Sequence, residues 1–132
     1  MTEIITNFIL QISGKPKENV FKALEKIVDQ IKQHNKYDVL NVDILEPSFD
    51  EKTKLFSGVI DIKIRFDTIQ YLLEFVYDYM PISIEIEEPS KLNIQAADLN
   101  NILNDISMKL LEYLTQVNHL NFYIKNELNK NK

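Results

Sequence analysis

The amino-acid sequence predicts an α+β fold in which strands and helices alternate and a long helix follows them. Two patterns carry this prediction. Four segments place apolar residues at every second position, as in a strand with one buried face, and three segments repeat them every three or four positions, as in an amphipathic helix. With 132 residues, of which 45% are hydrophobic, the chain suffices for a folded core, so we expect a single domain over residues 1–132.

The N-terminal part of the chain predicts a strand followed by a helix. Apolar and polar residues alternate from Ile4 to Ile12, and Gly14 and Pro16 then interrupt the pattern. Proline suits the first turn of a helix, because the N–H that it lacks would have no partner there. The expected helix has an apolar face made of Val20, Phe21, Leu24, Ile27, Val28 and Ile31.

Two further strands are expected in the middle of the chain. Leu40, Val42 and Ile44 alternate with polar residues, and residues 47–54 then form a polar connection. The next strand has the clearest alternation, and we expect Gly58 to form a bulge at its start. Its inward face consists of Ile60, Ile62, Ile64 and Phe66.

A second helix and a fourth strand follow. Asp67 or Thr68 can cap the helix, because a short side-chain oxygen accepts hydrogen bonds from the first turn. The helix extends to Tyr79, and Met80 and Pro81 end it. The inward residues of the fourth strand are Ile82, Ile84 and Ile86.

The resulting order, βαββαβ, resembles that of the ferredoxin-like fold. Right-handed connections between such elements give a four-stranded antiparallel sheet with both helices on one face. The resemblance implies a topology but no activity, because the fold hosts many functions. The order also resembles that of RNA-recognition modules, yet Phe8 and Phe66 fall on the inward face, where they cannot stack on bases. Together with a formal net charge of −5, this argues against nucleic-acid binding.

We expect a third helix over residues 96–128, with a heptad seam along one side and Asp98 in its first turn. The seam residues, spaced alternately four and three apart, are Leu99, Leu103, Ile106, Leu110, Tyr113, Val117, Leu120 and Ile124. At 1.5 Å per residue the helix would span roughly 48 Å, which exceeds the diameter of a compact domain of this size. Either it kinks near residues 118–121 or something else covers its overhang. Residues 129–132 are expected to fray.

Apolar residues beyond those needed for a core predict an interaction surface on the second and third helices. The candidate interface consists of Tyr71, Phe75, Tyr79, Leu120, Tyr123 and Ile124. Because aromatic residues are enriched at interfaces, we expect a non-catalytic module that forms a homodimer or binds a protein partner. The alternative is that the third helix covers the second within the same chain.

A small-molecule ligand is a second hypothesis. Gly14 lies at a strand-to-helix junction, where phosphate-binding loops occur. The layout resembles ligand-binding regulatory domains of the ACT kind, and this resemblance implies a ligand site near that junction. An enzyme ranks last, because no nucleophile or base has a recognisable partner.

No cofactor and no metal are expected. The chain has no cysteine, and its two histidines, His34 and His119, are far apart in the sequence and have no metal-binding motif around them. The strands also carry acidic residues, namely Asp43, Asp61, Glu85 and Glu87. The basic residues Lys63 and Arg65 are expected on the same face, and such a mixture of charges is typical of a solvated sheet. No apolar run approaches the roughly 18 residues of a bilayer span, and the first residues lack the basic start of a secretory signal. We therefore expect no membrane association and a cytoplasmic location.

Overall fold

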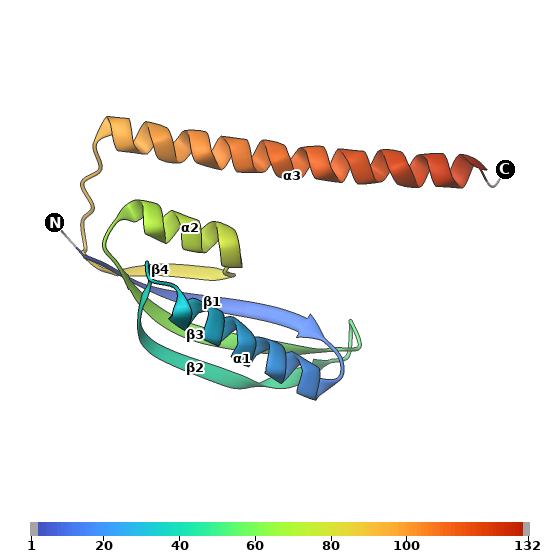
Figure 1. The fold of residues 1–132 in the computed structure, drawn as a ribbon. Helices are drawn as coiled ribbons and strands as arrows, with labels where there is room; N and C mark the ends of the chain where they lie inside the picture. The colour runs from blue at the N-terminus through green and yellow to red at the C-terminus, as the bar shows by residue number, and fades with distance from the viewer. Residues whose placement is uncertain (1–2, 131–132) are drawn as a thin grey trace. The chain divides into compact units, whose positions relative to one another are not determined.

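The computed structural model describes residues 3–130, and the contacts between residues divide the chain into two units, Met1–Leu92 and Asn93–Lys132. Unit 1 contains six elements (Figure 1). They are β1 (Ile4–Gly14), α1 (Lys17–Gln33), β2 (Asp38–Asp50), β3 (Leu55–Phe66), α2 (Ile69–Tyr79) and β4 (Ser83–Glu88). Unit 2 contains α3 (Ala96–Lys130). The single domain expected over residues 1–132 stays a prediction.

The four strands of unit 1 form one sheet in the order β2-β3-β1-β4, and every neighbouring pair is antiparallel. The predicted α+β class, the antiparallel sheet and the long C-terminal helix are therefore confirmed. In the register, Phe8 of β1 lies opposite Ile62 of β3 and Thr6 opposite Ile64. These residues share one face of the sheet, because side chains two positions apart point the same way.

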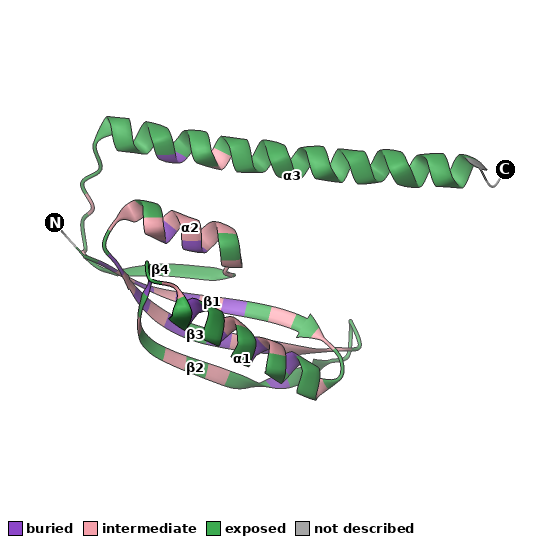
Figure 2. Ribbon diagram, in the orientation of Figure 1, coloured by how far each residue is buried: buried purple, intermediate pink, exposed green. Residues whose placement is uncertain are grey.

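The core of unit 1 lies between that face and the two helices α1 and α2 (Figure 2). Phe8, Ile60, Ile62, Ile64 and Phe66 are fully buried, so their predicted inward orientation is confirmed. The helices add Val20, Leu24, Val28, Ile31, Leu72 and Phe75. Thr6 is the polar residue of this core, and among the described residues its hydroxyl has no hydrogen-bond partner.

Helix α2 begins and ends as its sequence predicts. The Thr68 hydroxyl accepts a hydrogen bond from the backbone N–H of Tyr71 at 3.3 Å, which caps the first turn. Met80 adopts a left-handed conformation (φ 46°), and its N–H donates to the carbonyl of Val76 at 2.9 Å. Pro81 follows directly, so the chain leaves the helix and enters β4.

The hairpin between β2 and β3 is longer than expected. Strand β2 continues to Asp50 and β3 begins at Leu55, so the predicted polar connection over residues 47–54 shrinks to a turn that the Lys54 N–H closes on the Asp50 carbonyl at 2.8 Å. Gly58 pairs in register with Ile12 of β1. The irregularity expected at Gly58 occurs opposite it in β2, where Glu46 and Pro47 lie between the pairs Leu45–Val59 and Ser48–Ser57.

Two strands bury less than their alternation predicts. Leu40 was expected to point inward, but a register shift between Val39 and Asn41 turns it outward and leaves it 43% exposed. Ile84 lies opposite Phe8 on the helix-covered face, as expected, and yet is 48% exposed. The physical reason is position. Strand β4 lies at the edge of the sheet next to β1, and the buried Phe75 of α2 packs on Phe8 of β1, so Ile84 stays partly exposed.

Helix α3 runs without interruption from Ala96 to Lys130, so the kink considered near residues 118–121 does not occur. The helix ends two residues beyond the expected boundary, and residues 131–132 of the expected frayed tail lie outside the described residues. Apart from the buried Ile102 and the half-buried Ile106, the side chains of residues 96–129 are exposed (Figure 2). Within residues 3–130, no helix combines the length and the apolar character needed to cross a bilayer.

Candidate functional site

The face of the sheet that α1 and α2 do not cover carries paired charges. Asn7 Nδ2 donates to Asp61 Oδ1 at 2.9 Å, and Lys63 Nζ lies 2.9 Å from a Glu87 carboxylate oxygen. The hydrogen bond and the charge of Glu87 raise the pKa of Lys63. Arg65 pairs with Asp38 across β3 and β2. Exposed pairs of this kind contribute at most about 1 kcal/mol each, so this face has the character of a solvated surface.

The histidines do not form a metal site. His34 caps the C-terminus of α1, and its ring stacks on Tyr37 with 4.3 Å between centroids. His119 lies on α3 beside Leu120 and Tyr123. Within residues 3–130, no group of three histidine, aspartate or glutamate side chains is close enough to hold a metal ion.

Tyr37 is a buried aromatic residue whose hydroxyl has no hydrogen-bond partner among the described residues. Burial, together with the nearby carboxylates of Asp78 and Glu74, raises its pKa to about 12. Tyr37 also packs edge-on against Phe66 and Phe75. These contacts make Tyr37 part of the packed core of unit 1.

The aromatic residues of α2 split into core and surface. Phe75 was expected at an interface, but it is fully buried, with its ring centroid 4.4 Å from that of Phe8. It belongs to the core of unit 1 and is not available to a partner. Tyr71 and Tyr79 are half-buried against the same core, and Tyr71 also faces the Lys36 ammonium at 5.2 Å. They therefore contribute only their outer edges to any interface.

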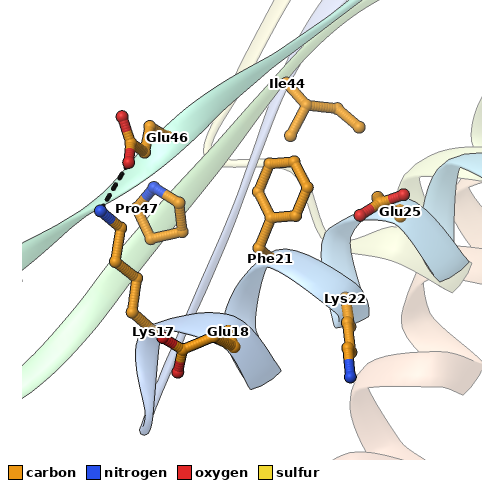
Figure 3. Close-up of a pocket in the computed structure, with 8 residues that line it drawn as sticks. All are labelled: Lys17, Glu18, Phe21, Lys22, Glu25, Ile44, Glu46 and Pro47. Carbon is orange, nitrogen blue, oxygen red and sulfur yellow. Dashed lines mark hydrogen bonds and ion pairs between the residues drawn. The ribbon is translucent and has the colours of Figure 1, made fainter.

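A groove of about 650 Å³ lies between the first half of α1 and the middle of β2 (Figure 3). Phe21 stands opposite Ile44 at its centre, and the ion pair of Lys17 and Glu46, 2.6 Å apart, closes one end. The hydrogen bond and the charge of Lys17 lower the pKa of Glu46. A ligand was expected near Gly14, but these lining residues could not be predicted, because a groove between a helix and a strand leaves no spacing pattern in the sequence.

The heptad seam of α3 is the most extended apolar surface among the described residues of unit 2. Seven of its eight residues are 41–66% exposed, and the eighth, Ile106, is half-buried. Leu120, Tyr123 and Ile124, expected at an interface, are exposed together on the C-terminal half of the helix. Further exposed apolar residues that the seam does not include are Met108, Leu111, Leu114, Phe122 and Leu128. The seven-residue period could not predict these, because they lie on other sides of the helix.

A protein-family model described as the MJ0538 family matches residues 5–132, which take in the elements from β1 to α3. No curated protein and no solved structure matches the chain.

Proposed function

We propose that the chain, which belongs to the MJ0538 family, is a non-catalytic module that self-associates through α3. One observation carries this proposal, namely the row of exposed apolar residues that follows the heptad period from Leu99 to Ile124. Exposed apolar patches of this extent mark interaction sites in soluble proteins. The seven-residue period matches what a partner helix requires.

The energy available suits a dimer of moderate affinity. Burying a leucine or isoleucine side chain fully stabilises by about 1.5–3 kcal/mol, and the seam residues are roughly half exposed at present. Each seam residue would therefore contribute about 1 kcal/mol on pairing, on the order of 16 kcal/mol for both copies. Association costs about 4–15 kcal/mol in lost freedom, which leaves a surplus of about 1–12 kcal/mol. The middle of this range, about 6–7 kcal/mol, corresponds to a dissociation constant on the order of 10 μM.

Light scattering on matched variants tests the proposal. We expect the parent chain to form a dimer at about 100 μM, a concentration chosen from the affinity above. Replacing two seam residues with lysine (Leu110→Lys and Leu120→Lys) should give a monomer, because two charges would be buried in each copy without partners. The matched control changes two exposed apolar residues outside the seam, Met108→Lys and Phe122→Lys, and should remain a dimer. A monomeric parent chain, or equal effects of both pairs, would contradict the proposal.

A small-ligand site is the second candidate, and the groove between α1 and β2 favours it. The groove lies next to the strand-to-helix junction at Gly14, where the sequence analysis expected a ligand of an ACT-like domain. The lining holds two ammonium groups (Lys17 and Lys22) and three carboxylates (Glu18, Glu25 and Glu46), so the groove suits a ligand with polar groups of both signs and an apolar part against Phe21. A metabolite that binds the groove would raise the melting temperature of the parent chain and not that of a Phe21→Glu variant. A broad screen without such a shift counts against this candidate.

We also propose that unit 1 has the ferredoxin-like topology. The element order βαββαβ supports it, as does the strand order β2-β3-β1-β4, which is β4-β1-β3-β2 when counted from the other edge. Helices α1 and α2 both contribute to the core on one face. An experimental structure in which β1 does not lie between β3 and β4 would exclude this topology. A cytoplasmic location stays a prediction, which fractionation of the native cell would test.

A further inference from the structure

We infer that two copies of the chain pair through α3 in antiparallel orientation, centred between Leu111 and Glu112. This inference rests on the proposed self-association and adds the geometry of the pair. In an antiparallel pair, seam residues that precede the centre lie opposite seam residues that follow it. The continuous helix from Ala96 to Lys130 allows this pairing to extend over the whole seam.

In the antiparallel pair, no seam residue is left without an apolar partner. For every seam residue before the centre there is one at the same distance after it, so all eight find an apolar partner in the second copy. The four layers, each formed twice, are Leu99 with Ile124, Leu103 with Leu120, Ile106 with Val117, and Leu110 with Tyr113.

Side-chain size favours this orientation over a parallel one. In a parallel pair in register, Tyr113 would lie against Tyr113 of the second copy, and Val117 against Val117 one layer further on. The largest and the smallest seam residues would then form adjacent layers, although two packed helices keep a nearly constant separation of about 8–10 Å. The antiparallel pair joins Tyr113 with leucine and Val117 with isoleucine, which makes the layers similar in volume.

The charges on α3 favour the same orientation. The first half of the helix carries Asp98, Asp105, Lys109 and Glu112, a net charge of −2, whereas the second half carries Lys125, Glu127 and Lys130, a net charge of +1. An antiparallel pair brings these halves level with each other, with Lys125 of one copy at the height of Asp98 of the other. In an antiparallel pair the two helix dipoles also point in opposite directions and attract each other, whereas in a parallel pair they point the same way and repel.

Distances between spin labels test the orientation, and the absence of cysteine from the chain makes single-site labelling possible. We would label Glu112→Cys and Lys125→Cys, two exposed positions outside the seam. At 1.5 Å per residue, the antiparallel pair separates the two copies of residue 125 by about 40 Å along the axis and those of residue 112 by only about 2 Å. In a parallel pair both distances would be about 20 Å or less.

The possible outcomes test the orientation of the pair and the self-association separately. A short distance at residue 112 with about 40 Å at residue 125 supports the antiparallel pair. Short distances at both positions overturn the orientation and leave the dimer intact. No dipolar signal at either position, together with a monomer mass by light scattering, overturns the self-association itself.

Disulfide formation provides an independent readout. Leu103→Cys and Leu120→Cys should cross-link under mild oxidation only when the two variants are mixed, because these positions face each other in the antiparallel pair. Each variant alone is the matched control. Cross-linking of either variant with itself would overturn the antiparallel orientation.

Discussion

Strand β3 approaches helix α1 closely at Gly58, and this contact supports a quantitative prediction. Gly58 is buried in β3 beneath α1, and a Cβ atom placed on it would lie 2.5 Å from Leu24 Cδ1 and 3.0 Å from Val20 Cγ1. Leu24 is fully buried, so its side chain has no open space to move into. The Gly58→Ala substitution therefore forces the helix or the Leu24 side chain away from the sheet.

Two opposing effects set the size of the change. Overpacking of a well-filled core costs about 1–3 kcal/mol. Alanine restricts the unfolded chain and returns about 0.4–1 kcal/mol where the native φ suits it, as it does here because Gly58 has no positive φ. We therefore expect Gly58→Ala to lower the free energy of unfolding by about 1–2 kcal/mol.

Gly14→Ala is the matched control, because the added Cβ would lie 3.5 Å from Val20 Cγ2, an ordinary contact. This variant should be slightly more stable than the parent chain, by about 0.5 kcal/mol. Leu24→Ala should cost about 2–5 kcal/mol in the parent chain, and less in the Gly58→Ala background, because it removes the atom that clashes. Native-state hydrogen exchange of the β3 amides measures all four changes within unit 1. Equal effects of the two glycine substitutions, or additive effects at residues 24 and 58, would refute the reasoning.

Three further predictions concern unit 1. Thr6→Val should raise the free energy of unfolding by about 1 kcal/mol, because it removes a buried hydroxyl that has no partner among the described residues. Thr68→Val should lower it by about 1 kcal/mol, because it removes the cap of α2. Urea unfolding measures both changes, and changes in the same direction would contradict these two roles. Since the pKa of Tyr37 rises from 10.0 to about 12 in the folded state, the folded state holds this proton more tightly, so its contribution is complete below pH 10 and is lost as the pH rises toward 12. Tyr37→Phe should reduce this alkaline loss in a pH series of unfolding experiments, and an unchanged slope would argue against the shift. Ile62→Thr should lower the free energy of unfolding by about 2–4 kcal/mol, because Ile62 is fully buried. Ile84→Thr should lower it by less than about 1 kcal/mol, because Ile84 is 48% exposed. Similar thermal midpoints of the two variants would show that Ile84 of β4 is covered as well as Ile62.

Periodicity predicted the elements of the fold because each buried face repeats over many residues. The alternation in β3 and the three-and-four spacing in α1 each place several side chains in the core, so a local irregularity does not hide the pattern. The boundaries were less predictable. Strand β2 continues through Pro47 to Asp50 because β3 pairs with it there, and such pairing depends on residues distant in the sequence.

Whether a side chain is buried was harder to predict than the face of the sheet to which it points. Ile84 and Ile86 point to the same side of the sheet as Phe8 and Thr6, as their alternation indicates. Whether a helix covers that side of β4 depends on where α2 crosses the sheet, and no local pattern encodes this. Phe75 shows the opposite case, since an aromatic residue thought to exceed the needs of the core fills its centre between Phe8 and Tyr37.

The candidate surface on α3 was predictable because it depends on one helix alone. The heptad spacing requires only that the helix be continuous, and the structure has it unbroken from Ala96 to Lys130. The groove between α1 and β2 could not be predicted, because Phe21 and Ile44 come together only through the fold.

The length of α3 affects how the protein will behave in spectroscopy. This helix holds 35 residues, against 17 in α1 and 11 in α2, so most of the helical ellipticity of the described chain comes from unit 2. A long helix with mostly exposed side chains gains little beyond its own hydrogen bonds and frays gradually on heating. Far-ultraviolet melting curves will therefore follow α3, broaden on dilution if α3 is paired, and conceal the sharper transition of the sheet. Near-ultraviolet signals from the tyrosines at residues 37, 71, 77 and 79 will report that transition instead.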